Sequence, residues 1–257
     1  MTVTISIANQ KGGVGKSTTT ANLGVSLAEK GKKVLLVDMD RQSHIAKLLG
    51  FKKDEIGARN IVSVLEKDGE YTIEEVIYDV PGVNNLSIIP SSRYLAMLEL
   101  EMNNRIAKDK ILDRTLRTIR DNYDYILIDC PPQLSLLTIN AFSTSDYILV
   151  PVKTDELSLD GLEELIETYT EVKELLNEKL EFLGAIANFY ESSTTNGKKI
   201  VDKLKNNYGL DLLSVVKKST EVEKYIELGL TITQKNPNHE VAQEFRNIAD
   251  IIIERTK

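Results

Sequence analysis

Residues 10–18 read Gln-Lys-Gly-Gly-Val-Gly-Lys-Ser-Thr, a glycine-rich run that carries two lysines, Lys11 and Lys16. The residues before it, 3–8, are apolar and β-branched, and those after it, 18–29, have a helical pattern. A glycine-rich run between a strand and a helix is the setting of a phosphate-binding loop, in which backbone N–H groups and the positive end of the helix face the phosphates. The sequence therefore predicts that a phosphorylated ligand binds at Gly12, Gly13, Val14, Gly15, Lys16, Ser17 and Thr18.

The loop departs from the strict pattern G-x-x-x-x-G-K-[ST], because Gln10 occupies the place of the first glycine and Lys11 adds a second cation. In such loops the lysine at the position of Lys16 reaches the β- and γ-phosphates. The hydroxyl at the position of Ser17 is placed to ligate the Mg²⁺ that bridges them. The pattern thus predicts a nucleoside triphosphate bound with Mg²⁺.

The second element is Asp129, a candidate magnesium ligand that ends the apolar run Tyr125 to Asp129. A buried strand that ends in a carboxylate has the form of the magnesium-side acid of such an enzyme. Asp129 could instead be a simple strand-end cap. Pro131 and Pro132 follow it, so a helix cannot start at once and a turn near the γ-phosphate is expected.

The third element is Val37-Asp38-Met39-Asp40-Arg41-Gln42, at the end of another apolar run. Residues two apart on an extended chain project to the same side, so Asp38 and Asp40 are both expected to face the phosphates, where one of them could orient water. The alternative for Asp40 is an ordinary surface-loop aspartate. The candidate magnesium ligands are Ser17, Asp40 and Asp129.

Six strand-like runs alternate with mostly helical segments, which predicts an α/β fold with a mainly parallel sheet covered by helices on both faces. No linker or internal repeat divides the chain, so we expect a single domain over residues 1–257. In such sheets ligands bind at the carboxyl ends of the strands, where the phosphate loop, Asp38 and Asp129 would meet. The runs are Val3 to Asn9, Lys33 to Asp38, Leu86 to Ile89, Tyr125 to Asp129, Tyr147 to Val152 and Phe182 to Asn188.

The composition, 42% hydrophobic and 28% charged, is typical of a soluble globular protein, and no apolar run is long enough to cross a membrane. There is no signal-peptide pattern, and the single cysteine, Cys130, cannot form an intramolecular disulfide, so we expect a cytoplasmic protein. The net charge is −7, yet residues 196–224 hold seven lysines against four acids. Either a solvated helix or contact with nucleic acid explains this surplus.

The three motifs together resemble those of the ParA/Soj partition ATPases within the ParA/MinD superfamily. The resemblance rests on Lys11-Gly-Gly-Val-Gly-Lys-Ser-Thr18, Val37-Asp-Met-Asp-Arg-Gln42 and Ile126-Leu-Ile-Asp-Cys-Pro-Pro132. It continues through Leu137-Thr-Ile-Asn-Ala141, Val150-Pro-Val152 and Leu159-Asp-Gly-Leu162, and so covers nearly the whole chain. It implies a P-loop NTPase fold.

The resemblance also implies a mechanism, in which ATP sandwiched between two subunits drives formation of a homodimer. Lys11 would cross to the partner's phosphates, Asp40 would orient the attacking water, and Asp129 would hold Mg²⁺ directly or through water. The ATP-bound dimer would bind DNA without sequence preference on the nucleoid, until a ParB-like centromere-binding protein stimulates hydrolysis. Asn188 resembles an asparagine that contacts adenine, although a strand-end turn explains it equally, and Pro237 lies where the family often has a base-side loop.

The chain also departs from the family pattern. The family usually has Asp-Pro-Gln where this chain has Asp40-Arg41-Gln42, and Ser193 and Glu221 stand where relatives carry DNA-contacting arginines. Non-specific DNA binding needs charge more than shape, so other basic residues can replace those arginines. The candidate DNA contacts are Lys198, Lys199, Lys203, Lys217 and Lys218.

Three other functions remain as alternatives. A MinD-like ATPase acting on a membrane or protein surface would use a basic amphipathic C-terminus, whereas residues 241–257 contain Glu244, Asp250 and Glu254. An electron-transfer ATPase like the nitrogenase iron protein needs two cysteines per subunit, and the chain has one. An adaptor that binds nucleotide without turnover also fits. No helix-turn-helix segment precedes the loop in this sequence, so we expect the short form of the family.

Overall fold

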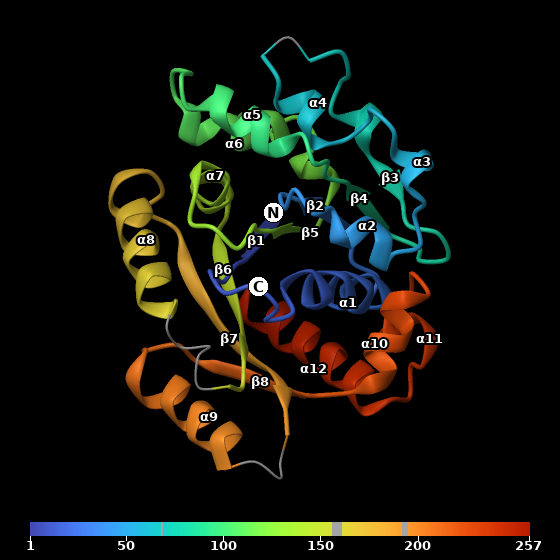
Figure 1. Cartoon of the computed structure of the whole chain (residues 1–257), viewed down its shortest axis with the longest axis vertical. Coiled ribbons are helices and arrows are strands. Elements are labelled where there is room, and N and C mark those ends of the chain that lie inside the picture. The colour runs from blue at the N-terminus through green and yellow to red at the C-terminus, as the bar shows by residue number, and fades with distance from the viewer. Residues whose placement is uncertain (68, 156–160, 192–194) are drawn as a thin grey trace.

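An eight-stranded sheet forms the centre of the computed structural model, which describes residues 1–67, 69–155, 161–191 and 195–257 (Figure 1). Three residues named above, Leu159, Asp160 and Ser193, lie outside the described residues. The strand order is β3-β4-β2-β5-β1-β6-β7-β8, and every neighbouring pair is parallel except β3 with β4. The strands are β1 (Val3–Ile7), β2 (Val34–Asp38), β3 (Tyr78–Asp79), β4 (Leu86–Ile89), β5 (Tyr125–Asp129), β6 (Tyr147–Lys153), β7 (Glu181–Tyr190) and β8 (Leu212–Lys217).

Two hydrophobic cores lie on opposite faces of this sheet, because its central strands are apolar on both sides. One core is covered by α4 (Ile61–Leu65), α5 (Leu95–Met102), α6 (Ile111–Leu116), α7 (Leu136–Thr144), α8 (Leu162–Leu175) and α9 (Thr195–Asn207). The other is covered by α1 (Lys16–Glu29), α2 (His44–Leu48), α11 (Ile232–Lys235) and α12 (Glu240–Arg255), with α10 (Thr220–Glu227) beside them (Figure 1). The short helix α3 (Lys53–Ile56) follows α2.

The register of the central strands brings the functional motifs to one edge of the sheet. Ile7, which ends β1, is paired with Asp129 at the end of β5, and Asp129 is paired in turn with Asp38 at the end of β2. The phosphate loop leaves β1 at this same edge. Two carboxylates and the loop therefore meet because three adjacent parallel strands end together.

Helix α1, which begins at the loop, is held by packing and charge. Its residues from Thr19 to Ala28 are all buried, and it packs on α12. Two ion pairs join these helices, Arg246 with Glu29 (Nε–Oε2 2.7 Å) and Lys30 with Asp250 (2.6 Å). The ion pairs thus hold the C-terminal end of α1 on α12, while its buried side chains pack the body of the helix into the core.

The predicted fold is confirmed: a single α/β domain with a mostly parallel sheet and helices on both faces. All six predicted strands are present with bounds that differ by at most a few residues, and α7 begins only at Leu136, after Pro131 and Pro132. Strands β3 and β8 were not predicted. In the described part of the chain, no helix combines the length and the apolar character that a membrane span needs.

Candidate nucleotide-binding site

The phosphate loop turns into α1 at Gly15, which has φ 88° and serves as the N-cap of the helix. This left-handed conformation favours glycine. The space is also closed to a side chain, because an added Cβ would lie 2.9 Å from Nδ2 of Asn188 and 3.4 Å from the ring of Phe189. Val14 is fully buried beneath the loop, and its carbonyl accepts a hydrogen bond from Nδ2 of Asn188 at 2.9 Å. The end of β7 therefore supports the loop from behind.

Lys16 is nearly buried, at 7% exposure. Its amine donates to the carbonyl oxygens of Asn9 (3.0 Å) and Lys11 (3.2 Å), so it is held inside the curve of the loop. Burial lowers the pKa of this amine, while the nearby carboxylates of Asp129 and Asp40 act in the opposite direction. An ammonium group held at this place can donate charge-assisted hydrogen bonds to phosphate oxygens.

Asp129 lies beside the first turn of α1. Its Oδ2 accepts a hydrogen bond from Ser17 Oγ at 2.6 Å, and its Oδ1 accepts one from Thr20 Oγ1 at 3.4 Å. Burial raises the pKa of this carboxyl to about 7, although the two hydroxyls and the Lys16 amine partly offset the increase. A bound cation would compensate the buried negative charge.

Asp38 and Asp40 differ in their burial and in their position relative to the cavity. Asp38 is fully buried, and its carboxylate accepts hydrogen bonds from the backbone N–H groups of Asp40 (3.0 Å) and Ile45 (3.3 Å). Burial, together with the neighbouring Asp129, raises the pKa of Asp38 well above its usual value. The expectation that both carboxylates face the phosphates is wrong for Asp38, because β2 ends there and the chain turns, so the alternation of an extended strand no longer applies. Asp40 alone of the two lines the cavity.

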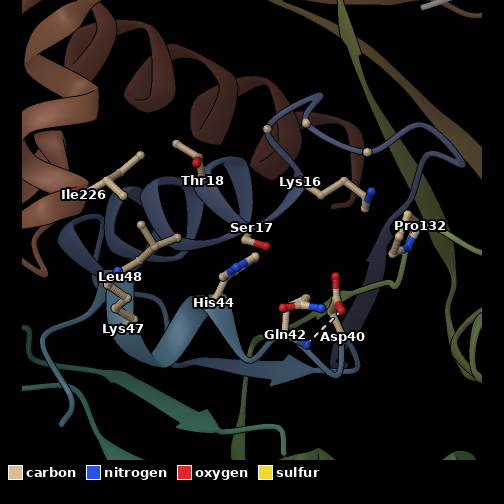
Figure 2. A pocket seen from close by; sticks show the side chains of 13 residues that line it. Lys16, Ser17, Thr18, Asp40, Gln42, His44, Lys47, Leu48, Pro132 and Ile226 are labelled. Atoms are coloured by element: carbon tan, nitrogen blue, oxygen red, sulfur yellow. Dashed lines mark hydrogen bonds between the residues drawn. The ribbon is translucent and has the colours of Figure 1, made fainter. Parts of the chain in front are cut away.

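A cavity of about 490 Å³ lies in front of the loop (Figure 2). The phosphate loop and the start of α1 form one wall, and Asp40 with the following turn and α2 form the other (Figure 2). The lining residues are Gly12, Gly13, Gly15, Lys16, Ser17, Thr18, Asp40, Gln42, His44, Lys47, Leu48, Pro132 and Ile226. Most of the residues predicted to bind phosphate are thus brought together, with Asp129 behind Ser17.

The oxygen donors of this cavity fit a magnesium ion. Ser17 and Asp40 line it, and Asp129 contacts the Ser17 hydroxyl. Mg²⁺ is usually held by one or two carboxylates together with waters and substrate phosphates, so no cluster of three acidic or histidine ligands is needed, and none is present among the described residues.

Lys11 does not line this cavity. Its Nζ lies 3.0 Å from Oδ1 of Asp155, just beyond β6, and the other oxygen of Asp155 pairs with Lys153 at 3.0 Å. The side-chain amide of Gln10 donates a hydrogen bond to Glu164 of α8. The variant half of the loop is therefore tied to the segment that follows β6.

A second cavity of about 70 Å³ adjoins the first, since Gly15, Thr18 and Ile226 line both. Asn188 lines it, and its Oδ1 is buried without a hydrogen-bond partner among the described residues. Pro237 lines neither cavity; it is exposed, and its carbonyl accepts from Gln243 and Arg246. The structure thus brings Asn188 to the site and leaves Pro237 outside it.

The candidate DNA contacts divide into two groups. Lys198, Lys199 and Lys203 are exposed on α9. Lys217 and Lys218 instead form ion pairs, with Glu240 at 2.6 Å and with Glu191 at 2.9 Å. The helix therefore presents the less compensated positive charge. Glu221, which stands where relatives carry an arginine, accepts a hydrogen bond from Asn236 at 2.9 Å.

Sequence reasoning did not single out several residues of the two cavities, chiefly His44, Lys47, Ile226 and Phe189. His44 and Lys47 lie on the helix that begins two residues after Gln42. Predicting a helix at that place would have indicated that both residues face the phosphate loop. Phe189 has φ 56°, which is strained for a bulky residue and carries no signal in a single sequence.

A family model described as an AAA domain matches residues 2–182. The sporulation initiation inhibitor protein Soj of Bacillus subtilis is 39% identical over 204 residues, which cover 79% of each chain. The chromosome partitioning protein ParA of Caulobacter vibrioides is 30% identical over 256 residues, covering 98% of this chain and 94% of that protein.

Among solved structures, the cobyrinic acid a,c-diamide synthase of Mycobacterium smegmatis with bound ATP analogue and magnesium is similar over the full length. The TM-score is 0.86 at 27% identity, and the match covers 100% of this chain and 96% of that one.

Proposed function

The chain belongs to the ParA/Soj family of partition ATPases, and on that premise we propose that it is an ATP-dependent dimerisation switch that binds DNA non-specifically. Hydrolysis of ATP, stimulated by a ParB-like centromere-binding protein, would release the dimer from DNA and so drive the segregation of a plasmid or chromosome. The protein would act in the cytoplasm, on the nucleoid when ATP is bound. The single observation that carries the proposal is the separation of the two loop lysines. Lys16 faces the cavity, whereas Lys11 lies outside its lining.

ATP and Mg²⁺ are the ligands that suit the cavity best. The backbone N–H groups of the loop and the amine of Lys16 would hold the β- and γ-phosphates. Ser17, Asp40 and Asp129 supply the oxygen donors for Mg²⁺, which would neutralise charge on the phosphates. The solved relative with an ATP analogue and magnesium supports this choice.

Asp40 is the residue proposed to orient the attacking water. It is 8% exposed and lines the cavity opposite Lys16 (Figure 2). Its Oδ1 accepts the N–H of Gln42 at 3.0 Å, and its own N–H is held by Asp38, so both the backbone and the carboxylate are fixed. A preorganised carboxylate can position water without moving in the transition state.

Lys11 is proposed to act on the partner's nucleotide. Its amine pairs with Asp155 and lies outside the lining of its own cavity, which supports a role toward a partner's phosphates. A cation supplied in trans would stabilise transition-state charge only after the dimer forms. Assembly and hydrolysis would then be coupled.

Asn188 is proposed to select adenine. Its Nδ2 already donates to Val14 and to Thr19 Oγ1 (3.1 Å), so Oδ1 remains as an acceptor. Adenine carries an exocyclic amine that can donate to it, whereas guanine has a carbonyl at the corresponding position.

The decisive experiment compares Asp40→Ala with the wild type, measuring ATP turnover and, by light scattering with Mg-ATP, the molar mass. We expect turnover to fall by roughly 10²- to 10⁴-fold while the ATP-dependent dimer persists. Unchanged turnover in the variant contradicts the role of Asp40. If the wild type binds ATP but does not hydrolyse it, even with DNA and the partner protein present, the protein is instead an adaptor that binds nucleotide without turnover.

A further inference from the structure

Helix α2 forms the wall of the cavity that faces the phosphate loop, and its polar side chains have no role in the mechanism above. His44 and Lys47, three residues apart, both line the cavity. Figure 2 shows the His44 imidazole pointing across the cavity toward Ser17, at the start of α1. Besides Lys16, these two are the residues of the lining that can carry positive charge, and Asp40 is its acid.

Neither side chain is occupied by another interaction. Among the described residues, the His44 side chain has no hydrogen bond and the Lys47 amine has no ion pair, and both residues are exposed. Buried neighbours, by contrast, hold the helix itself: Ile45, Ala46 and Leu48 belong to the core shared with α1 and α12. The donors of α2 are therefore directed into the cavity by a helix that is packed in place.

Both ends of α2 are fixed. At its start, the N–H of Ile45 donates to the buried carboxylate of Asp38 at 3.3 Å. At its end, Gly50 lies against Gly229, which follows α10. A Cβ on Gly229 would lie 3.1 Å from the Cα of Gly50 and from the carbonyl oxygen of Lys47. The absence of side chains lets the two backbones touch.

We propose that His44 and Lys47 bind the phosphate of the nucleotide nearest the ribose, so that α2 completes the phosphate site opposite the loop. This inference rests on the proposed nucleotide function. Lys16 and Ser17 serve the β- and γ-phosphates, whereas Thr18 comes next along α1 and Ile226 marks the cavity's border with the second cavity, which contains Asn188. His44 and Lys47 face the interval between them, where the α-phosphate would lie. An imidazole N–H and an ammonium group are both suitable donors to a phosphate oxygen.

Histidine NMR offers a direct test, because the chain contains only two histidines, His44 and His239. Mg-ADP is the probe, since it carries the α-phosphate without the triphosphate that dimerisation requires. We expect saturation with Mg-ADP to shift the ring signals of His44. Those of His239, whose Nδ1 accepts the N–H of Val241 at the start of α12, should stay in place. Adenosine, which has no phosphate, should leave both unchanged.

Calorimetry with alanine variants gives an independent readout. His44→Ala and Lys47→Ala should each weaken Mg-ADP binding roughly tenfold, the effect of losing a charge-assisted hydrogen bond. Lys179→Ala is the matched control, because this exposed lysine lies before β7 at the opposite edge of the sheet. If the wild type binds Mg-ADP while the His44 signals stay fixed and both variants keep their affinity, the role of α2 is rejected and the nucleotide site stands. If the wild type binds no nucleotide, both proposals fall.

Discussion

The amine of Lys11 lies 3.0 Å from Oδ1 of Asp155, although 144 residues separate them in the chain. The contact exists because β1 and β6 are neighbours in the sheet, so the loop after β1 and the segment after β6 leave the same edge side by side. In a single protomer, the lysine proposed to act in trans is thus paired within its own chain.

Asp155→Asn should favour the ATP-bound dimer. The substitution removes a charge that competes with the partner's phosphates for Lys11. Both side chains of this pair are partly exposed, at 28% and 37%, so the gain is small, about two- to fivefold in the dimer dissociation constant. Sedimentation with Mg-ATP measures it. Asp211→Asn, which breaks the surface pair with Arg255, is the control. Weaker dimerisation of Asp155→Asn would show that Asp155 assists assembly instead.

Without nucleotide and magnesium, the protein should lose stability as the pH rises. The carboxyl of Asp129 has its pKa raised from 3.8 to about 7, so the folded state keeps a proton that the unfolded chain has released between these values. The contribution of this carboxyl to the free energy of unfolding is therefore fully present below the unfolded pKa of 3.8, and it is lost as the pH rises to about 7. We expect a melting temperature several degrees lower at about pH 8 than at about pH 5.

Asp129→Asn tests this assignment, since an amide does not titrate. Its melting temperature should vary less with pH than that of the wild type, with buried Asp38 contributing the remaining dependence. Asp211→Asn, at the surface, should behave like the wild type. An Asp129→Asn curve parallel to the wild-type curve would contradict the role of Asp129.

Replacing the three exposed lysines of α9, Lys198, Lys199 and Lys203, by alanine should weaken DNA binding in the Mg-ATP form. Each phosphate contact contributes about 0.9 to the slope of log K against log salt, so the slope should fall by up to about three. Titration by fluorescence anisotropy across salt measures it. The double variant of Lys217 and Lys218 should have a smaller effect, because Glu240 and Glu191 already pair these amines. The reverse order of effects would assign the DNA surface to the end of β8.

Asn188→Ala should reduce the preference for ATP over GTP, because the buried acceptor Oδ1 is lost. We expect ATP affinity to fall roughly tenfold and GTP affinity to change less. Competition between the two nucleotides at equilibrium gives the ratio. An equal loss for both would mean that Asn188 only supports the loop through Val14 and Thr19.

The elements that the sequence predicts well are those whose signal is local. The phosphate loop, the strand ending at Asp129 and the other central strands were each indicated by residues a few positions apart, and all are present. Strand β8 (Leu212–Lys217) was not predicted, because its short run lies within the lysine-rich segment 196–224, which was interpreted only by its charge. Strand β3 has only two residues.

The parts of the site that depend on tertiary packing could not be predicted from the sequence. Asp155 meets Lys11 only through the pairing of β1 with β6, and α2 faces the loop only because Asp38 turns inward and holds it. Pro237 was expected near the base but lies outside both cavities, because position along the chain does not define the path of a loop.

The most direct test of the central claim mixes two inactive variants, Lys11→Ala and Asp40→Ala. In a mixed dimer, the site on the Lys11→Ala protomer keeps its own Asp40 and receives Lys11 from its partner, so one of the two sites is complete. If Lys11 acts in trans, the equimolar mixture should recover about a quarter of wild-type turnover, since half of the dimers are mixed and each has one working site. A mixture that stays as inactive as either variant alone, although mass spectrometry detects the mixed dimer, would contradict the account.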